Sequence, residues 1–461
     1  MTTHQPLSPL ALGVATASYQ IEGAVTEDGR GHSIWDTFTA LPGRIRNGDD
    51  GAHACDSYHR VEEDVALVRG LGVDAYRFSL AWPRILPEGR GRVETRGLDY
   101  YERLVDALLD AGIEPVATLY HWDLPQPLED AGGWPARETA EAFVEYAGVV
   151  HQRLGDRVTS WATHNEPWCA AYLGYAAGVH APGRREGAAG HRAAHHLLLG
   201  HAWAREALPG AHVGIVLNLA PVWPESPEAE QVADGVDAIR NRVWLGPLVD
   251  GAYDDRLLAM APVLADTELV RPGDLESIQG SADWLGINYY TPIRPQVAAG
   301  QGEPHPEQDA YPGVEGLDLV VREPRTDIGW EIEPRGLEEL LVQTHQRTGL
   351  PLTITENGAA CADRQVVDGM VDDADRIDYL SGHLAAVDRA RAAGADVRGY
   401  FVWTLLDNFE WAEGYDKTFG LVHVDRSSPS LPRTPKASYH WFAEKVAAPA
   451  QGRNAAGLLS P

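Results

Sequence analysis

Two glutamates stand where a carboxylate is chemically unusual. Glu166 closes the stretch VTSWATHNE and precedes Pro167, which cannot extend a helix or a strand ladder, so we expect Glu166 at the end of a buried strand. Glu356 has the same place in PLTITENG. A carboxylate at a strand end is either an ion-pair partner beneath a loop or a catalytic group. One glutamate alone does not distinguish the ion-pair role from the catalytic role. Two glutamates brought together by the fold would favour the catalytic role.

Other expected strand ends carry amide, imidazole, phenol and indole side chains, namely those of Gln20, His121, Trp122, Asn165, Asn288, Tyr290 and Trp403. Amides can bind sugar hydroxyls, and aromatic faces can cover the C–H side of a sugar ring. Paired carboxylates can protonate a glycosidic oxygen and attack an anomeric carbon. If these strand ends converge, the set predicts a site for glycoside cleavage.

Eight short apolar runs recur along the chain, each followed by a segment with helical spacing of apolar residues; they begin at Ala11, Asp74, Glu114, Val158, His212, Asp283, Pro351 and Val397. This alternation predicts an α/β fold, a (β/α)₈ TIM barrel with elaborated loops, in which the carboxyl ends of all strands meet at one mouth. The alternative is an open doubly wound sheet. That fold needs a Gly-rich phosphate turn after the first strand, and TASYQIEGA is not one.

The length of 461 residues fits one elaborated barrel, and a hydrophobic fraction of 44% supplies a large core. We expect a single catalytic domain over residues 1–461, with the core at about 8–446 and a mobile tail over 447–461. Residues 297–323 are polar and rich in Gly, Pro and acids, which predicts one long loop after the sixth strand.

The charge pattern excludes several partners. The net charge is −29 with no run of Lys or Arg, which argues against nucleic acid and acidic membrane surfaces. No apolar run approaches the ~20 residues of a spanning helix, and no charged leader precedes Arg30, so we expect a cytoplasmic protein. The scattered Cys55, Cys169 and Cys361 are interpreted as ordinary reduced thiols.

One histidine-rich segment, HRAAHHLLLGHA, needs separate consideration. His191 and His195 have the i, i+4 spacing of metal-binding helices, but the segment lacks the glutamate of a zinc protease motif and an evident third ligand. We therefore expect a structural role, with no metal and no cofactor.

Taken in order, the motifs resemble those of the family 1 glycoside hydrolases, typified by β-glucosidases. The resemblance runs from GVATASYQIEGA at Gly13 to RTPKASYHWF at Arg433, through YRFSLAWPRI, YHWDLPQPL, NEP, GINYYT, ITENG and DNFEWAEGY. Each motif alone is weak, whereas the ordered set is highly specific. The resemblance implies a retaining, exo-acting β-glycosidase.

The resemblance also implies a role for each site residue. Glu166 would be the general acid/base and Glu356 the nucleophile, held ionised by Arg77 and by the phenol of Tyr290. The residues implied to bind the sugar or line the site are Gln20, His121, Trp122, Asn165, Asn288, Tyr290, Trp403, Glu410 and Trp411, with Trp168 and Trp330 as candidate walls on the aglycone side.

His164 departs from the family pattern, since members more often carry an apolar residue before Asn-Glu-Pro. Strand alternation turns the side chain of His164 away from Glu166, so we interpret it as a packing change.

The expected substrates are small β-glucosides and cello-oligosaccharides, with side activity on β-galactosides and β-fucosides and a role in cellulose degradation. One alternative is a 6-phospho-β-glycosidase, whose members carry Ser in place of Glu410 with a Lys and a Tyr nearby. Here Lys417 is present beside Glu410 and Phe419, and a carboxylate at Glu410 would repel phosphate. The other alternative, a catalytically silent sugar-binding protein, is disfavoured because both carboxylates are present.

Overall fold

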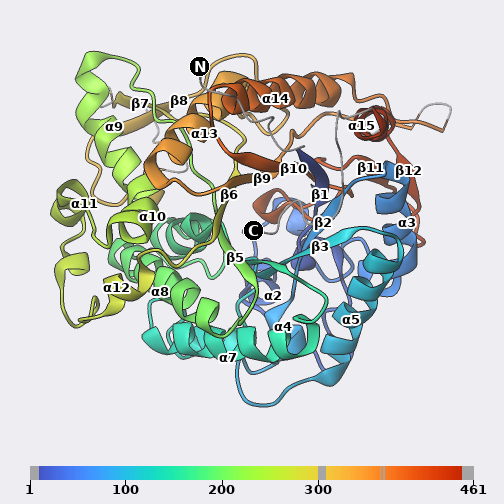
Figure 1. Cartoon of the computed structure of the whole chain (residues 1–461), viewed down its shortest axis with the longest axis horizontal. Helices are drawn as coiled ribbons and strands as arrows, with labels where there is room; N and C mark the ends of the chain where they lie inside the picture. Colours follow the sequence, from blue (N-terminus) through green and yellow to red (C-terminus); the bar gives the residue numbers. More distant parts are fainter. Residues whose placement is uncertain (1–9, 299–307, 364, 367–368, 449–461) are drawn as a thin grey trace, which may run out of the picture.

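Eight parallel strands close into a barrel in the computed structural model, which describes residues 10–298, 308–363, 365–366 and 369–448 (Figure 1). Around the barrel the strands are β1 (Ala11–Ala15), β10 (Val397–Trp403), β9 (Leu352–Asn357), β6 (Trp284–Asn288), β5 (His212–Leu217), β4 (Ser160–Asn165), β3 (Glu114–Tyr120) and β2 (Ala75–Ser79). Each of the apolar runs expected to be strands contains one of them, and the predicted (β/α)₈ fold is confirmed.

Long helices surround the barrel in Figure 1: α3 (Val61–Leu71), α5 (Thr95–Asp110), α7 (Arg137–Leu154), α8 (Gly187–Glu206), α13 (Pro334–Thr348), α14 (Ala374–Ala392) and α15 (Ala437–Ala447). Shorter α-helices lie in the connections: α1 (Ser18–Ile21), α2 (Ile34–Thr39), α4 (Trp82–Ile85), α6 (Gln126–Asp130), α9 (Glu230–Asp237), α10 (Val243–Leu245), α11 (Asp255–Met260) and α12 (Asp274–Ile278).

The connections also contain π-helical turns at η3 (Cys169–Ala177), η5 (Ala238–Arg242) and η6 (Gly246–Asp250). Single 3₁₀ turns are η1 (Arg46–Gly48), η2 (Ser57–His59), η4 (Pro227–Ala229), η7 (Pro262–Ala265), η8 (Gln308–Ala310) and η9 (Trp411–Glu413).

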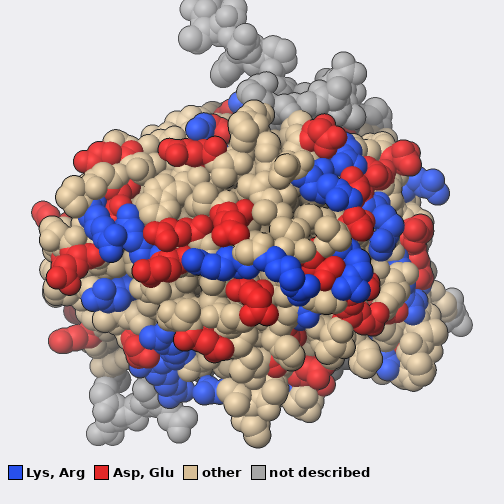
Figure 2. All heavy atoms as spheres, turned by 90° about the horizontal axis from the view of Figure 1, so that it is seen from below, with Lys and Arg blue, Asp and Glu red and all other residues tan. Residues whose placement is uncertain are grey.

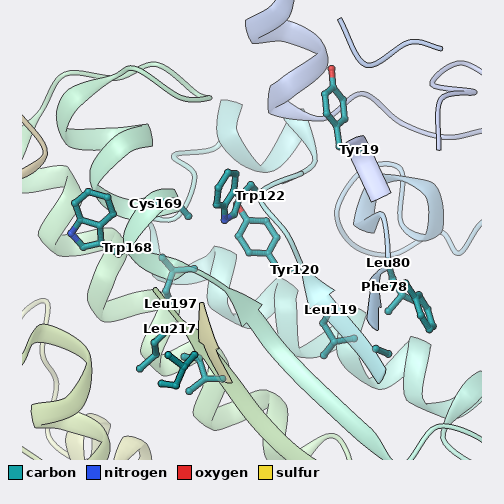
Figure 3. Close-up of a cluster of buried hydrophobic side chains, with 14 of the residues drawn as sticks. Tyr19, Phe78, Leu80, Leu119, Tyr120, Trp122, Trp168, Cys169, Leu197 and Leu217 are labelled. Atoms are coloured by element: carbon teal, nitrogen blue, oxygen red, sulfur yellow. The ribbon is translucent and has the colours of Figure 1, made fainter. Parts of the chain in front are cut away.

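The core lies between the barrel wall and the helices. Every residue of β4 is buried, as expected for a parallel strand covered on both faces. Helix α5 buries Tyr101, Leu104, Val105 and Leu108, whose spacing places them on one helix face. Figure 3 shows the same arrangement elsewhere, with Leu197 of α8 next to Leu217 of β5.

The expected single loop over 297–323 is wrong at its end, because β8 (Leu317–Val320) pairs antiparallel with β7 (Arg294–Val297). Leu317 is buried in this hairpin, and Gln296 Nε2 donates to Asp318 Oδ2 across it at 2.7 Å. The apolar alternation in LDLV was therefore a strand signal. A second hairpin joins β11 (Val422–Val424) to β12 (Arg433–Pro435). Residues 299–307, and most of the predicted tail (449–461), lie outside the described residues.

The histidines singled out in the sequence are hydrogen-bonded or packed. His191 Nδ1 lies 3.0 Å from the Tyr172 hydroxyl, and His195 bonds to Asp274 at 3.1 Å. The ring of His164 lies 4.5 Å from that of Phe143, on the helix side of β4. These contacts favour structural roles.

The surface mixes charges of both signs. Figure 2 shows a face on which basic side chains lie beside acidic ones rather than in a continuous basic patch. Among the described helices, none combines the length and the apolar character needed to cross a bilayer.

Candidate active site

The carboxyl ends of the strands border a cavity of about 450 Å³. Its lining includes both glutamates and most of the predicted site residues: His121, Trp122, Glu166, Asn288, Tyr290, Trp330, Glu356, Trp403, Glu410 and Trp411. Gln20, Arg77 and Asn165 are not part of that lining. They are buried directly behind it and hydrogen-bond the segments that form it.

Glu356, near the end of β9, accepts a hydrogen bond on each carboxylate oxygen. Arg77 Nη1, from β2, donates to Oε1 at 2.7 Å, and the Tyr290 hydroxyl donates to Oε2 at 2.8 Å. Both donors favour the ionised carboxylate. Burial outweighs them and, together with the nearby Glu166, raises the pKa of Glu356 to about 7. The sequence pointed to both donors, but it does not reveal how strongly burial of this carboxyl group opposes them.

Glu166 follows β4 with a backbone φ of 44°, a left-handed conformation that a non-glycine residue rarely adopts. Its amide donates to the Val216 carbonyl at 2.9 Å. Its Oε1 accepts from Asn288 Nδ2 at 2.7 Å, and its Oε2 accepts from the Cys169 thiol at 3.0 Å. Such strained positions cluster at functional sites, where surrounding contacts hold them.

A chain of hydrogen bonds joins the two carboxylates. Asn165 Oδ1 accepts from Arg77 at 2.7 Å and from Asn288 at 3.0 Å. Its Nδ2 must therefore be the donor to His121 Nε2, 3.0 Å away, which leaves the imidazole proton on Nδ1. Burial, helped by Arg77, holds the pKa of His121 well below its usual range, so this imidazole is neutral.

Several buried polar atoms beside the cavity have no hydrogen-bond partner among the described residues, and those near the two glutamates include Gln20 Oε1, His121 Nδ1 and Glu410 Oε2. Gln20 is held by its own amide, which donates to the Phe409 carbonyl at 2.9 Å. Buried polar atoms are normally paired, so such a group at a cavity is suited to ligand hydroxyls.

The expected repulsion between a Glu410 carboxylate and phosphate needs correction. Burial, reinforced by Glu356 and Glu166, raises the pKa of Glu410 to about 8, so its side chain is largely neutral at pH 7. A different observation disfavours phosphate: Lys417 Nζ does not line the cavity and bonds to the carbonyl and carboxylate of Asp327 at 2.7 and 3.0 Å.

Aromatic side chains form the walls. The Trp403 ring lies 6.0 Å from that of His121, and Trp411, whose φ is 51°, lies 4.5 Å from Trp122. Farther along the lining, Trp330 lies 5.1 Å from Tyr290. A larger cavity, of about 870 Å³, lies outside the barrel between α9, η5 and α13. Its lining includes neither Glu166 nor Glu356.

Sequence reasoning missed contacts made by Cys169 and Arg240. Cys169, interpreted as an ordinary thiol, donates to Glu166 and accepts from Asn218 Nδ2 at 3.2 Å. Its position three residues after Glu166, at the start of a helical segment, was an available signal. Arg240 lines the cavity from a connection distant in sequence, and its type and spacing held no comparable signal.

Comparison with known proteins gives one consistent result. The model of glycosyl hydrolase family 1 matches residues 8–450. Over 451 residues the chain is 47% identical to a bifunctional β-D-glucosidase/β-D-fucosidase of Bifidobacterium breve, with 94% of this chain and 96% of that protein covered. Over 440 residues it is 48% identical to a thermostable β-glucosidase B of Thermobispora bispora, with coverages of 94% and 89%.

The structural comparison agrees. The crystal structure of a psychrophilic β-glucosidase from Micrococcus antarcticus superposes with a TM-score of 0.91 at 46% identity, covering 96% of this chain and 98% of the other.

Proposed function

Because the chain belongs to glycosyl hydrolase family 1 and is a retaining β-glucosidase, we propose that Glu356 is its nucleophile and Glu166 its general acid/base. The enzyme hydrolyses terminal non-reducing β-D-glucosyl residues by double displacement. One observation supports the division of roles: a charged group, Arg77, contacts Glu356, whereas the donors to Glu166, Asn288 and Cys169, are neutral.

The two steps follow from this arrangement. A Glu356 oxygen attacks the anomeric carbon as the glycosidic bond breaks, and the proton of Glu166 goes to the departing oxygen. Glu166 then takes a proton from water, the water oxygen attacks the anomeric carbon, and Glu356 leaves as a carboxylate. Two inversions retain the configuration, and we expect the two carboxyl groups about 5 to 5.5 Å apart.

The glycone would occupy the inner end of the cavity. There Gln20 Oε1, His121 Nδ1 and Glu410 Oε2 can pair with hydroxyls, and Trp403 can stack beneath the ring. Asn165 would use its remaining amide hydrogen for the 2-hydroxyl, since its oxygen already accepts two bonds. Trp411 would complete this subsite, with Trp122 beside it.

The substrates proposed are aryl and alkyl β-glucosides and cello-oligosaccharides, which would give the enzyme a part in cellulose degradation. The glucosidase/fucosidase relative supports side activity on β-fucosides, and we extend this to β-galactosides. We also propose one catalytic domain and a cytoplasmic location. Cys55, Cys169 and Cys361 are buried and form no disulfide within the described residues, which suits a reducing compartment.

Azide trapping tests the roles of the two glutamates. In Glu356→Gly, azide can enter beside the anomeric carbon from the vacated face, so an activated aryl β-glucoside should yield the α-glycosyl azide. In Glu166→Ala, the glycosyl–enzyme still forms from the same substrate, and azide should attack it from the other face to yield the β-glycosyl azide. Product configuration is measured by proton NMR.

Glu413→Ala is the matched control, since Glu413 also lines the cavity but pairs with Arg46 at 2.9 Å. This variant should release glucose without azide. Exchange of the two azide configurations between the variants would reverse the assignment.

A further inference from the structure

Arg240, in η5, is a cation in the wall of the active-site cavity, and it has no ion-pair partner among the described residues. Its guanidinium carbon lies 4.1 Å from the centre of the Trp168 ring, and both residues line the cavity. The buried Nε of Arg240 has no hydrogen-bond partner in the part of the chain that the structure describes. An arginine held on an aromatic face keeps the N–H groups on its edge available for a planar anion.

Two other charged residues of the same lining have ion-pair partners. Arg294 pairs with Glu331 at 2.7 Å, and Glu413 pairs with Arg46 at 2.9 Å. The chain has 67 acidic residues against 38 Lys and Arg, so carboxylates that could have neutralised Arg240 are abundant. Leaving a half-buried guanidinium without one costs free energy unless a ligand supplies the missing charge.

The position of Arg240 identifies which part of a substrate it would meet. Trp168 follows Glu166 by two residues, and the proposed acid/base lies on the side from which the leaving group departs. Trp168 lies 5.5 Å from Tyr311, another residue of the lining, and Figure 3 shows it directed away from Trp122 of the inner wall. A leaving group on this side would therefore meet aromatic faces with a guanidinium at the edge.

We propose that Arg240 selects β-glucosides whose aromatic aglycone carries a carboxylate. The aromatic ring would lie among Trp168, Tyr311 and Trp330, and the carboxylate would accept paired hydrogen bonds from the guanidinium. The inference rests on the proposed function, because the aglycone must leave past Glu166. The net charge of −29 and the two catalytic carboxylates disfavour binding of an anionic substrate elsewhere in the cavity. The positive charge of Arg240 would therefore decide whether an anionic substrate binds.

The test compares para-carboxyphenyl β-glucoside with para-carbamoylphenyl β-glucoside, which match in shape and differ in charge. The measured quantity is the ratio of kcat/KM for the acid to that for the amide. Replacing Arg240→Met should lower this ratio by ~10-fold or more while the amide is still hydrolysed, and Arg240→Lys should restore part of it. The intrinsic difference between the two leaving groups cancels when variants are compared.

Arg256→Met is the matched control, since Arg256 lies on the neighbouring α11, pairs with Asp234 at 3.3 Å and does not line this cavity. Its ratio should equal that of the wild type. A measurement on the wild type alone gives a second readout: para-hydroxybenzoate should inhibit at a lower concentration than para-hydroxybenzamide.

An unchanged ratio in Arg240→Met, or equal inhibition by the two phenols, would overturn the inference while leaving the glucosidase assignment in place. If the wild type releases no phenol from either glucoside, the proposed function itself fails.

Discussion

At the scale of single residues, the site places three carboxylates in one cavity and separates them by their contacts. Glu356 bonds to Arg77 and Tyr290, Glu166 bonds to Asn288 and Cys169, and Glu410 keeps one oxygen without a partner among the described residues. Burial raises the pKa values of Glu356 and Glu410, and the carboxylates near each of them raise these values further. The protonation of Glu356 and Glu410 therefore depends on the charges around them.

The acidic limb of the pH–rate profile should report this balance. Glu356 must be ionised to attack, and its raised pKa predicts that kcat/KM rises with pH towards about 7 rather than levelling off near 5. Tyr290→Phe removes a donor to the carboxylate, so it should move this limb to higher pH and lower kcat. Tyr439→Phe removes a buried phenol donor distant from the site and should leave the limb in place.

Glu410 should contribute to binding at the expense of stability. The pKa of Glu410 is about 8 in the folded protein against the usual 4.5, so the folded state favours the protonated acid. Ionising Glu410 therefore lowers the free energy of unfolding. This loss grows as pH rises from about 4.5 to 8 and is constant at higher pH. Glu410→Gln should therefore raise the melting temperature more at pH 9 than at pH 5. The same change should lower kcat/KM for glucosides by ~10- to 100-fold. Equal melting shifts at the two pH values would contradict the raised pKa.

At the scale of elements, the strand ends are held in place by close backbone contacts and buried ion pairs. A Cβ atom at Gly358 would lie 1.9 Å from the Trp403 carbonyl oxygen, so glycine lets the segment after β9 approach β10 and sets Glu356 beside Trp403. Behind the segment that carries Glu410 and Trp411, Lys436 Nζ bonds to Asp407 and Asp363, each at 2.8 Å.

Lys436→Met should destabilise the protein strongly, because it leaves the buried carboxylates of Asp363 and Asp407 without this cation. Breaking one side of a buried ion pair costs about 3 to 5 kcal/mol, which urea unfolding can measure. Lys445→Met, an exposed lysine of α15, should change the free energy of unfolding by less than about 0.5 kcal/mol. Similar losses in the two variants would show that burial of Lys436 is not the cause.

At the scale of the whole molecule, one hydrophobic cluster extends from Leu12 in β1 to Val446 in α15 and includes residues from every barrel strand. We therefore expect the chain to unfold as one unit, with loss of activity, far-ultraviolet circular dichroism and the calorimetric peak at the same temperature. Two resolved calorimetric transitions would contradict the single domain predicted over 1–461.

The sequence alone was sufficient to predict the order of strands and helices along the chain and which polar and aromatic side chains stand at the strand ends. Apolar runs such as those at Glu114 and Val158 became β3 and β4, because burial and backbone geometry impose a local periodicity. Family resemblance then selected Glu166 and Glu356 from many acids. Both the apolar runs and the motifs are local in sequence.

Only the tertiary structure decided which side chains meet. The bond from Asn288 to Glu166 joins residues 122 positions apart, and Arg240 reaches Trp168 from a separate connection. Such contacts depend on the register around the closed barrel and on the path of long connections, neither of which has a local sequence signal. The raised pKa values of Glu356 and Glu410 likewise follow from burial by residues far away in the chain, so no inspection of the motifs could have supplied them.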